Sequence, residues 1–263
     1  MRIGAVSYLN TKPLVYGLAE LAPQAELVFD LPSRLADQLA AGQLDVALIP
    51  SIEFFQNPAY TIISDACIGC RGPVMSVKLL SRVPLSKIQT LALDEGSRTS
   101  AALVRILLKE RYDLEPELLP FPIDARPDSL AADAILMIGD RAMHPPAGRF
   151  VAEWDLGEEW CRWSGLPFVF AMWVARNDVG DIDTILNIAR DNGVAHLSEI
   201  AQREHAAVGL TYAQTLHYLR DNLYFHLGPR ERQGLQLYYE HACRLGLAPE
   251  GRDVEPQPVS IAG

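Results

Sequence analysis

The sequence has no surplus of positive charge. Its 263 residues include 23 lysines and arginines against 33 aspartates and glutamates, so its formal net charge is −10 with neutral histidines. It also has no tract rich in basic residues. Because nucleic acids and anionic membrane surfaces repel a chain of this charge, we expect neither as a partner.

Long hydrophobic runs are absent as well. A membrane helix needs roughly 20 consecutive apolar residues, whereas the apolar segment at residues 166–175 is interrupted by Pro167 and followed by Arg176. Residues 1–6 lead into a strand-like segment without the charged and apolar regions of a signal peptide. We therefore expect no membrane association and a cytoplasmic location.

Cysteine is scarce, with 4 residues in the whole chain, which excludes a disulfide scaffold. Cys67 and Cys70 form a Cys-x-x-Cys pair, but the second pair or the spaced histidines of a zinc site are missing, so we interpret them as buried thiols. The sequence also lacks a Gly-x-x-x-x-Gly-Lys phosphate loop, a dinucleotide-binding fingerprint and a Gly-x-Ser-x-Gly motif. These absences argue against metal, nucleotide and serine-hydrolase chemistry.

The chain does contain an alternation of short apolar runs and amphipathic segments. This pattern is typical of strands and helices that form a largely parallel sheet. Strands are predicted at residues 2–7, 26–30, 45–50, 60–66, 74–81, 90–93, 117–120, 134–138 and 169–176. Helices are predicted at residues 12–21, 33–41, 99–112, 181–191, 197–204, 211–223 and 229–245.

The alternation starts again after Pro84, which indicates two α/β lobes. We assign residues 1–84 and 174–263 to a discontinuous first lobe that includes the C-terminal helices, and residues 85–173 to the second lobe. Two such lobes face each other across a cleft, and open α/β sheets bind ligands beyond the carboxyl ends of their strands. Candidate functional residues are therefore sought at the strand ends.

Polar residues follow the first predicted strand, where Ser7, Asn10 and Thr11 stand at the beginning of a helix. The N–H groups of a helix start attract an anion, and neutral hydroxyl and amide groups add donors. Carboxylate binding and simple capping by Asn10 or Thr11 explain this segment equally well. Ser51 follows the third strand in the same way, and capping alone explains it.

A second polar segment in the first lobe contains Arg71 and Ser76. Arg71 offers a planar guanidinium group that fits a carboxylate, and Ser76 offers a hydroxyl group nearby. An ordinary surface arginine is the commoner finding at such a position.

In the second lobe, Ser97, Arg98, Thr99 and Ser100 stand between a strand and a long helix. Three hydroxyl groups and an arginine at a helix start suit an oxyanion, although capping by Ser97 or Thr99 explains part of the pattern. The functional interpretation is favoured because a matching donor cluster lies in the first lobe. Two facing anion sites imply a ligand with two acidic groups.

Another strand of the second lobe ends at Gly139 and Asp140. The glycine permits a close approach of backbone and ligand, and Asp140 is available for polar contact. A local ion pair between Asp140 and Arg141 is the simpler explanation of those charges.

Four of these segments together resemble one known family. They are VSYLNTKPL at 6–14, DVALIPS at 45–51, SRTS at 97–100 and WDLGEEW at 154–160. They are similar to the chorismate dehydratase branch of the MqnA/MqnD menaquinone-biosynthesis family, and the resemblance spans most of residues 2–245. It implies a two-lobed periplasmic-binding-protein-like type II fold that serves as a cytoplasmic enzyme of the futalosine pathway.

The reaction implied by this resemblance removes water from chorismate to give 3-[(1-carboxyvinyl)oxy]benzoate, without a cofactor. Chorismate carries two carboxylates, in agreement with the two facing anion sites. The resemblance further implies that Asn10 and Ser76 are catalytic residues that hold the side-chain carboxylate of the substrate, which itself removes the proton. Ser97, Arg98, Thr99 and Ser100 then hold the other carboxylate from the second lobe.

Two alternatives remain open. The sister branch, 1,4-dihydroxy-6-naphthoate synthase, is expected to use a histidine base where this sequence has Gly139. A non-catalytic module that binds a small anion is the second alternative, because this fold most often only captures solutes. The expected partner is in each case a small molecule, and the protein is expected to be a monomer or a homodimer.

Overall fold

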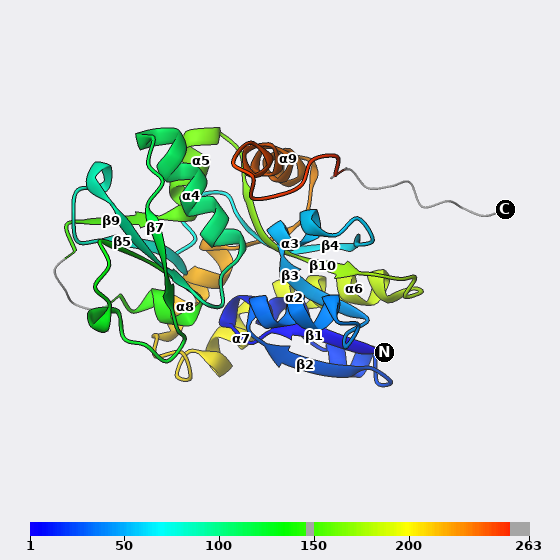
Figure 1. Cartoon of the computed structure of the whole chain (residues 1–263). Helices are drawn as coiled ribbons and strands as arrows, with labels where there is room; N and C mark the ends of the chain where they lie inside the picture. Colours follow the sequence, from blue (N-terminus) through cyan, green and yellow to red (C-terminus); the bar gives the residue numbers. More distant parts are fainter. Residues whose placement is uncertain (146–149, 253–263) are drawn as a thin grey trace.

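Two β-sheets, each flanked by helices, divide the chain into two lobes (Figure 1). The computed structural model describes residues 1–145 and 150–252. The chain is mixed α/β, as predicted. Among the described residues, no helix has the length and apolar character needed to span a membrane.

The first sheet has 6 strands in the order β11-β4-β10-β3-β1-β2. β1 is parallel to β2 and β3, whereas β10 is antiparallel to both β3 and β4. The carboxyl ends of β1 and β3 therefore lie at the same edge of the sheet. The strands are β1 Arg2–Val6, β2 Glu26–Asp30, β3 Val46–Pro50, β4 Thr61–Cys70, β10 Phe168–Ala175 and β11 Tyr224–His226.

The second sheet has 5 strands in the order β7-β6-β8-β5-β9. β6 is parallel to β7 and β8, and β5 is antiparallel to β8 and β9. The strands are β5 Val77–Ser81, β6 Thr90–Asp94, β7 Glu117–Phe121, β8 Ala134–Ile138 and β9 Ala152–Asp155.

The central strands β3, β8 and β10 are buried along their whole length. Each therefore consists of a nearly continuous apolar run, which is typical of strands covered by helices on both faces. These strands form the rigid centre of each lobe, and the residues that follow β3 and β8 are held in fixed positions.

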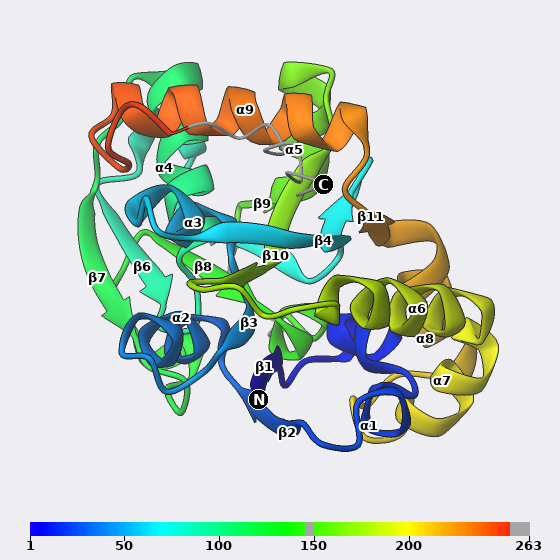
Figure 2. The same cartoon turned by 90° about the vertical axis from the view of Figure 1, so that its right-hand side faces the viewer.

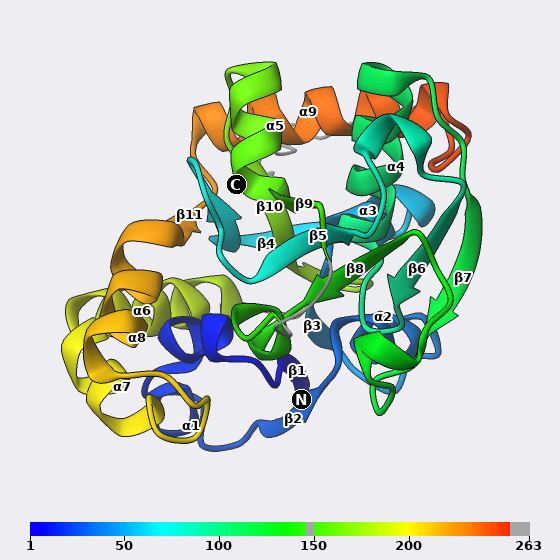
Figure 3. The same ribbon diagram turned by 90° about the vertical axis from the view of Figure 1, so that its left-hand side faces the viewer.

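Helices cover both sheets, and α9 joins the lobes. It packs against α3 of the first lobe and α4 of the second, and Figures 2 and 3 show it running across both. The second lobe carries α4 Thr99–Tyr112 and α5 Leu156–Ser164. The other α-helices are α1 Leu18–Leu21, α2 Pro32–Ala40, α3 Ser51–Gln56, α6 Ile182–Ala195, α7 Leu197–Glu204, α8 Tyr212–His217 and α9 Pro229–Arg244.

Five short helical segments complete the described elements. Four are 3-10 helices, and η5 is a π-helix that follows α8 directly. They are η1 Leu9–Val15, η2 Leu85–Lys87, η3 Pro127–Ser129, η4 Asp140–Met143 and η5 Tyr218–Asn222.

The boundaries between the lobes differ from the predicted ones. β5 belongs to the second sheet, although the predicted first lobe extends to residue 84. Most of β10 falls within the predicted second lobe at 85–173, yet this strand belongs to the first sheet. The chain crosses between β4 and β5 and returns between α5 and β10. Hydrophobic alternation in the sequence identifies strands, but it does not show to which of the two sheets a strand belongs.

One predicted helix, at residues 12–21, is also different. η1 and α1 take its place, with a break between them. Pro13 lies inside η1, where it removes a backbone donor, and Gly17 has the left-handed φ of 69° that ends helical continuity. The tight turns of η1 bring Asn10 and Thr11 close to the end of β1.

Candidate active site

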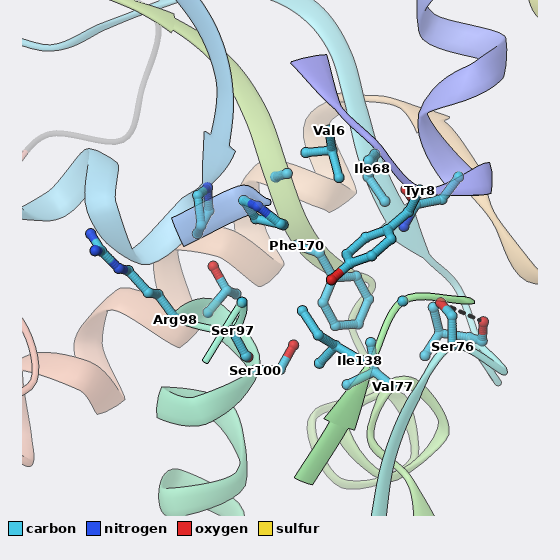
Figure 4. A pocket seen from close by; sticks show the side chains of 18 residues that line it. Val6, Tyr8, Ile68, Ser76, Val77, Ser97, Arg98, Ser100, Ile138 and Phe170 are labelled. Atoms are coloured by element: carbon cyan, nitrogen blue, oxygen red, sulfur yellow. Dashed lines mark hydrogen bonds between the residues drawn. The ribbon is translucent and has the colours of Figure 1, made fainter. Parts of the chain in front are cut away.

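A pocket lies between the lobes, beyond the carboxyl ends of β1, β3 and β8 (Figure 4). It encloses about 520 Å3 of space between atoms, part of which is open to solvent. Apolar side chains such as Ile68, Ile138 and Phe170 alternate around it with hydroxyl and amide groups. The predicted site residues that line it are Asn10, Ser76, Ser97, Arg98, Thr99, Ser100 and Gly139.

Asn10 lines the pocket from η1, and Thr11 orients its side chain. The Thr11 hydroxyl is completely buried and donates a hydrogen bond to Asn10 Oδ1 at 3.3 Å. This bond orients the Asn10 amide, whose side chain also hydrogen-bonds the Tyr218 hydroxyl, and an NH2 group has two protons to donate. Thr11, which was predicted as a ligand contact, does not line the pocket.

Ser76 lies on the segment that crosses between the lobes, and Asp155 holds this segment in place. The Asp155 carboxylate accepts hydrogen bonds from Val74 N at 2.9 Å and Met75 N at 2.6 Å. The same carboxylate accepts from Glu158 N at 3.0 Å and so caps α5. Met75 adopts a left-handed φ of 65°, a conformation that such bonds help to maintain.

The start of α4 supplies Ser97, Thr99 and Ser100 to the pocket. The buried Oγ of Ser97 has no hydrogen-bond partner among the residues that the structure describes. Thr99 Oγ1 lies 3.3 Å from Ser51 Oγ and accepts from Ile52 N at 3.3 Å, so it joins α4 to α3 of the other lobe. Ser97 is therefore one hydroxyl at this helix start that remains free for an anion.

Ser51 lies outside the pocket lining. Its completely buried hydroxyl donates to Val169 O at 2.8 Å and lies beside Thr99, and it does not line the pocket. The Ser51 hydroxyl thus links the end of β3 to β10 and to Thr99 of the opposite lobe.

Arg98 does not offer a free cation. Its guanidinium group pairs with Asp37 at 2.7 Å and with Glu53 at 3.2 Å, both in the first lobe. Figure 4 shows the Arg98 side chain extending away from Tyr8 and Ser76. These ion pairs hold the two lobes together at one side of the pocket.

Two further predicted residues lie outside the pocket lining. Ser7 is exposed, and its backbone N donates to Asp30 O at 3.1 Å. Arg71 forms an ion pair with the buried Glu231 at 2.8 Å and lies over the ring of Tyr224 at 3.6 Å. The predicted carboxylate clamp at Arg71 is therefore occupied by a carboxylate of the protein itself.

Asp140 contacts the first lobe without lining the pocket. Its two carboxylate oxygens accept hydrogen bonds from Leu9 N at 3.1 and 3.3 Å, at the start of η1. Burial raises the pKa of Asp140, and the Leu9 N–H opposes this effect. The expected local ion pair with Arg141 is not formed, since Arg141 binds Asp94 with its Nε at 2.9 Å.

Tyr8 is the residue that the sequence interpretation overlooked. Its side chain crosses from the first lobe into the pocket (Figure 4), and its buried hydroxyl has no hydrogen-bond partner among the described residues. Burial and the nearby Asp94 raise its pKa well above the usual value, so the phenol keeps its proton. A neutral phenol without a partner is a donor ready for an anionic ligand.

The side chains that line the pocket are almost all uncharged. Among the described residues, its lining includes no carboxylate, and the one charged lining residue, Arg98, is paired elsewhere. Asn10, Ser76, Tyr8 and Ser97 are instead neutral donors. Such groups bind carboxylates by hydrogen bonds without the cost of burying an unpaired charge.

The fold and this pocket define a two-lobed protein of the periplasmic-binding-protein-like class. Solved structures share the fold. Protein AF1704 from Archaeoglobus fulgidus has a TM-score of 0.73 and 16% identity, with 94% of this chain and 97% of that chain covered. The Candida albicans CA3427 gene product, described as having the generic periplasmic binding protein fold, has a TM-score of 0.63 and 12% identity, covering 97% and 92%.

The sequence comparisons give the family. Residues 1–244 match the family model described as menaquinone biosynthesis, and the chain belongs to that family. A curated relative from Thermus thermophilus, named chorismate dehydratase, is 30% identical over 275 aligned positions, which cover 94% of this chain and 96% of the relative. The resemblance predicted from the four sequence segments is thereby confirmed.

Proposed function

We propose that this protein is a chorismate dehydratase, a carbon–oxygen lyase that converts chorismate into 3-[(1-carboxyvinyl)oxy]benzoate and water. The observation that carries the proposal is the set of neutral donors that face the pocket from both lobes, Asn10, Tyr8 and Ser76 on one side and Ser97 on the other. This arrangement matches a small molecule with two carboxylates. The similarity to the Thermus thermophilus relative supports the same activity.

The elimination removes a proton from the ring carbon that bears the enolpyruvyl ether and expels the hydroxyl group of the neighbouring carbon. The released proton and hydroxide form water, and the ring becomes aromatic. No carboxylate or histidine lines the pocket among the described residues. The side-chain carboxylate of the substrate is therefore the proposed base.

Orientation is the main contribution of the protein in this scheme. Asn10 and Ser76 hold the side-chain carboxylate near the ring proton, and the start of α4 holds the ring carboxylate. A well-oriented intramolecular group can lower a barrier by roughly 7–11 kcal/mol. The apolar side chains of Phe170 and Ile138 border the same pocket, and we expect them to limit the access of water to the ring of the bound substrate.

The direct test is to mix purified protein with chorismate, follow the loss of its diene absorbance and identify the product by mass spectrometry. We expect formation of the benzoate with loss of one water. Asn10→Ala and Ser76→Ala are expected to reduce kcat by at least about 100-fold, as for groups that align reactants. Full turnover by either variant contradicts its catalytic assignment.

Two results would point to another function. Chorismate that is bound but unchanged indicates a binding module, and turnover of a cyclic futalosine derivative indicates the sister naphthoate synthase. A cytoplasmic location, the absence of a cofactor and a monomeric or homodimeric state remain predictions, the last testable by light scattering.

A further inference from the structure

Tyr218 lies behind the pocket, next to the residues assigned to catalysis. It is the first residue of the π-helix η5 and is completely buried. Its hydroxyl donates a hydrogen bond to Ser76 Oγ at 2.9 Å, although the two residues are 142 positions apart in the sequence. It does not line the pocket itself.

The η5 helix contacts the Ser76 segment at both of its ends. Tyr218 binds Ser76 at the first residue, and Asn222 Nδ2 donates to Pro73 O at 2.9 Å at the last. A π-helix is rare and occurs frequently at functional sites. The two bonds hold the Ser76 segment through η5, whose residues do not line the pocket.

The direction of this hydrogen bond determines what Ser76 can do. A phenol has one proton, and Tyr218 uses it on Ser76 Oγ. The hydroxyl proton of Ser76 is then directed elsewhere, and among the described residues its one acceptor is Val74 O at a long 3.4 Å, the dashed line in Figure 4. A ligand carboxylate in the pocket is a better acceptor, and donation from Tyr218 strengthens the Ser76 hydroxyl as a donor.

The charge state of Tyr218 is also fixed by its surroundings. Burial raises its pKa far above the usual value, and the nearby carboxylates of Asp140 and Asp155 act in the same direction. Ser76 and Asn10 favour the phenolate and lower the pKa, but burial outweighs them. Tyr218 therefore keeps its proton near neutral pH.

We propose that Tyr218 is a positioning residue that acts through Ser76, by donating its only proton to Ser76 Oγ and so directing the Ser76 hydroxyl toward a substrate carboxylate. This inference rests on the proposed function, because it assigns to Ser76 the binding of that carboxylate. It adds a residue from the C-terminal helices to a site otherwise built from strand ends.

The test is a double-mutant cycle with Tyr218→Phe, Ser76→Ala and the double variant, measured as kcat and KM for chorismate. Tyr218→Phe is expected to reduce kcat/KM about 10-fold, the effect of one hydrogen bond. In the Ser76→Ala background the same change is expected to alter kcat/KM less than about 3-fold, because Ser76 is gone and the contact of Tyr218 with Asn10 alone is left. A purely structural role for Tyr218 predicts the same factor in both backgrounds.

Tyr239→Phe is the matched control. Tyr239 is also buried, and its hydroxyl donates to Pro249 O at 2.9 Å, away from the pocket. We expect its loss to lower the melting temperature without changing kcat/KM. If Tyr218→Phe does not fold, the cycle uses 3-fluorotyrosine at position 218 instead. Its hydroxyl is a stronger hydrogen-bond donor than that of tyrosine. Activity is then expected to rise only where Ser76 is present.

The outcomes separate this inference from the proposed function. If the wild type converts chorismate and the two single effects multiply, the inference about Tyr218 is wrong while the function stands. If the wild type does not convert chorismate, the proposed function is wrong, and the cycle is repeated on the dissociation constant for chorismate. If the two single substitutions change the free energy of chorismate binding additively, or if chorismate does not bind at all, the inference about Tyr218 is wrong as well.

Discussion

The ring of Tyr8 lies against Gly139, so close that a Cβ on Gly139 would stand 2.6 Å from Cζ of the ring. The two residues belong to different lobes, at the ends of β1 and β8. Gly139 also has a left-handed φ of 69°. The absence of a side chain at residue 139 thus allows Tyr8 to cross the gap and reach the pocket.

Gly139→Ala is therefore expected to displace Tyr8 and to lower both stability and activity. The combined cost of backbone strain and overpacking is about 2–4 kcal/mol, measurable by urea unfolding. Gly165→Ala is the reference for a positive φ without a steric neighbour, since Gly165 has φ 71° and ψ 6°, against φ 69° and ψ −158° at Gly139, and no atom lies within 4 Å of the point where its Cβ would stand. It should cost only the strain, about 1–2 kcal/mol.

A second comparison isolates the contact. In a Tyr8→Ala background, the cost of Gly139→Ala should fall, because the ring is no longer in the way and only the strain of the Gly139 backbone conformation is left. An equal cost in both backgrounds would show that the Tyr8 ring does not set the requirement for glycine.

Tyr8→Phe is expected to have opposite effects on stability and on binding. The Tyr8 hydroxyl is buried without a partner among the described residues, and removing such a group relieves a desolvation cost of about 1–3 kcal/mol. The melting temperature should therefore stay the same or rise. Binding of the benzoate product, measured by calorimetry, should weaken about 10-fold because a donor is lost.

Unchanged binding by Tyr8→Phe would mean that the hydroxyl does not contact the ligand. A lower melting temperature would mean that this hydroxyl has a partner in solution. Tyr239→Phe again serves as the comparison, because it removes a hydroxyl that is satisfied within the fold and should only destabilise.

The sequence predicted much of the fold, because most elements are defined by local patterns. The predicted and observed bounds agree for β2, β8, α4 and α7, where apolar periodicity and terminal residues coincide. The short β11 and the β9–α5 segment were not predicted. β11 has 3 residues, too few for any periodicity, and it is a strand only because β4 offers it an edge.

Only those features of the site that depend on a single segment of the sequence could be predicted. The donors at the ends of β1 and at the start of α4 follow from local composition. The relationships between them do not, because Tyr218 and Ser76 are 142 positions apart and Leu9 and Asp140 are 131 apart. Their distances are set by the packing of two lobes, which no local pattern describes.

Arg71→Ala tests whether Arg71 contacts the substrate, as predicted from the sequence, or only pairs with Glu231, as in the structure. Arg71 pairs with Glu231, whose side chain is 1% exposed, so its loss leaves a buried carboxylate without its cation. We expect a destabilisation of about 1–3 kcal/mol and unchanged kcat and KM for chorismate below the melting temperature. Arg220→Ala, which breaks the exposed pair with Asp221, should change stability by less than about 1 kcal/mol.

A rise in KM for Arg71→Ala, without unfolding, would restore Arg71 as a substrate contact. The comparison needs both variants at the same temperature, so that loss of folded protein is not mistaken for weaker binding.

Asp140 gives a pH dependence of stability with a definite sign. Burial raises its pKa above the ordinary 3.8, although the Leu9 N–H and Lys12 act against this. The folded protein therefore binds the Asp140 proton more tightly than the unfolded chain does. As the pH rises from 3.8 through the pKa of the folded state, this group contributes a loss of stability.

Asp140→Asn is the reference for that measurement, because an amide oxygen can still accept from Leu9 N while the titration is abolished. The free energy of unfolding in urea is measured for both proteins across this pH range, and the contributions of all other groups cancel in the difference. We expect the wild type to lose stability relative to Asp140→Asn as the pH rises. The opposite slope would mean that the Leu9 N–H bonds outweigh burial and lower the pKa of Asp140.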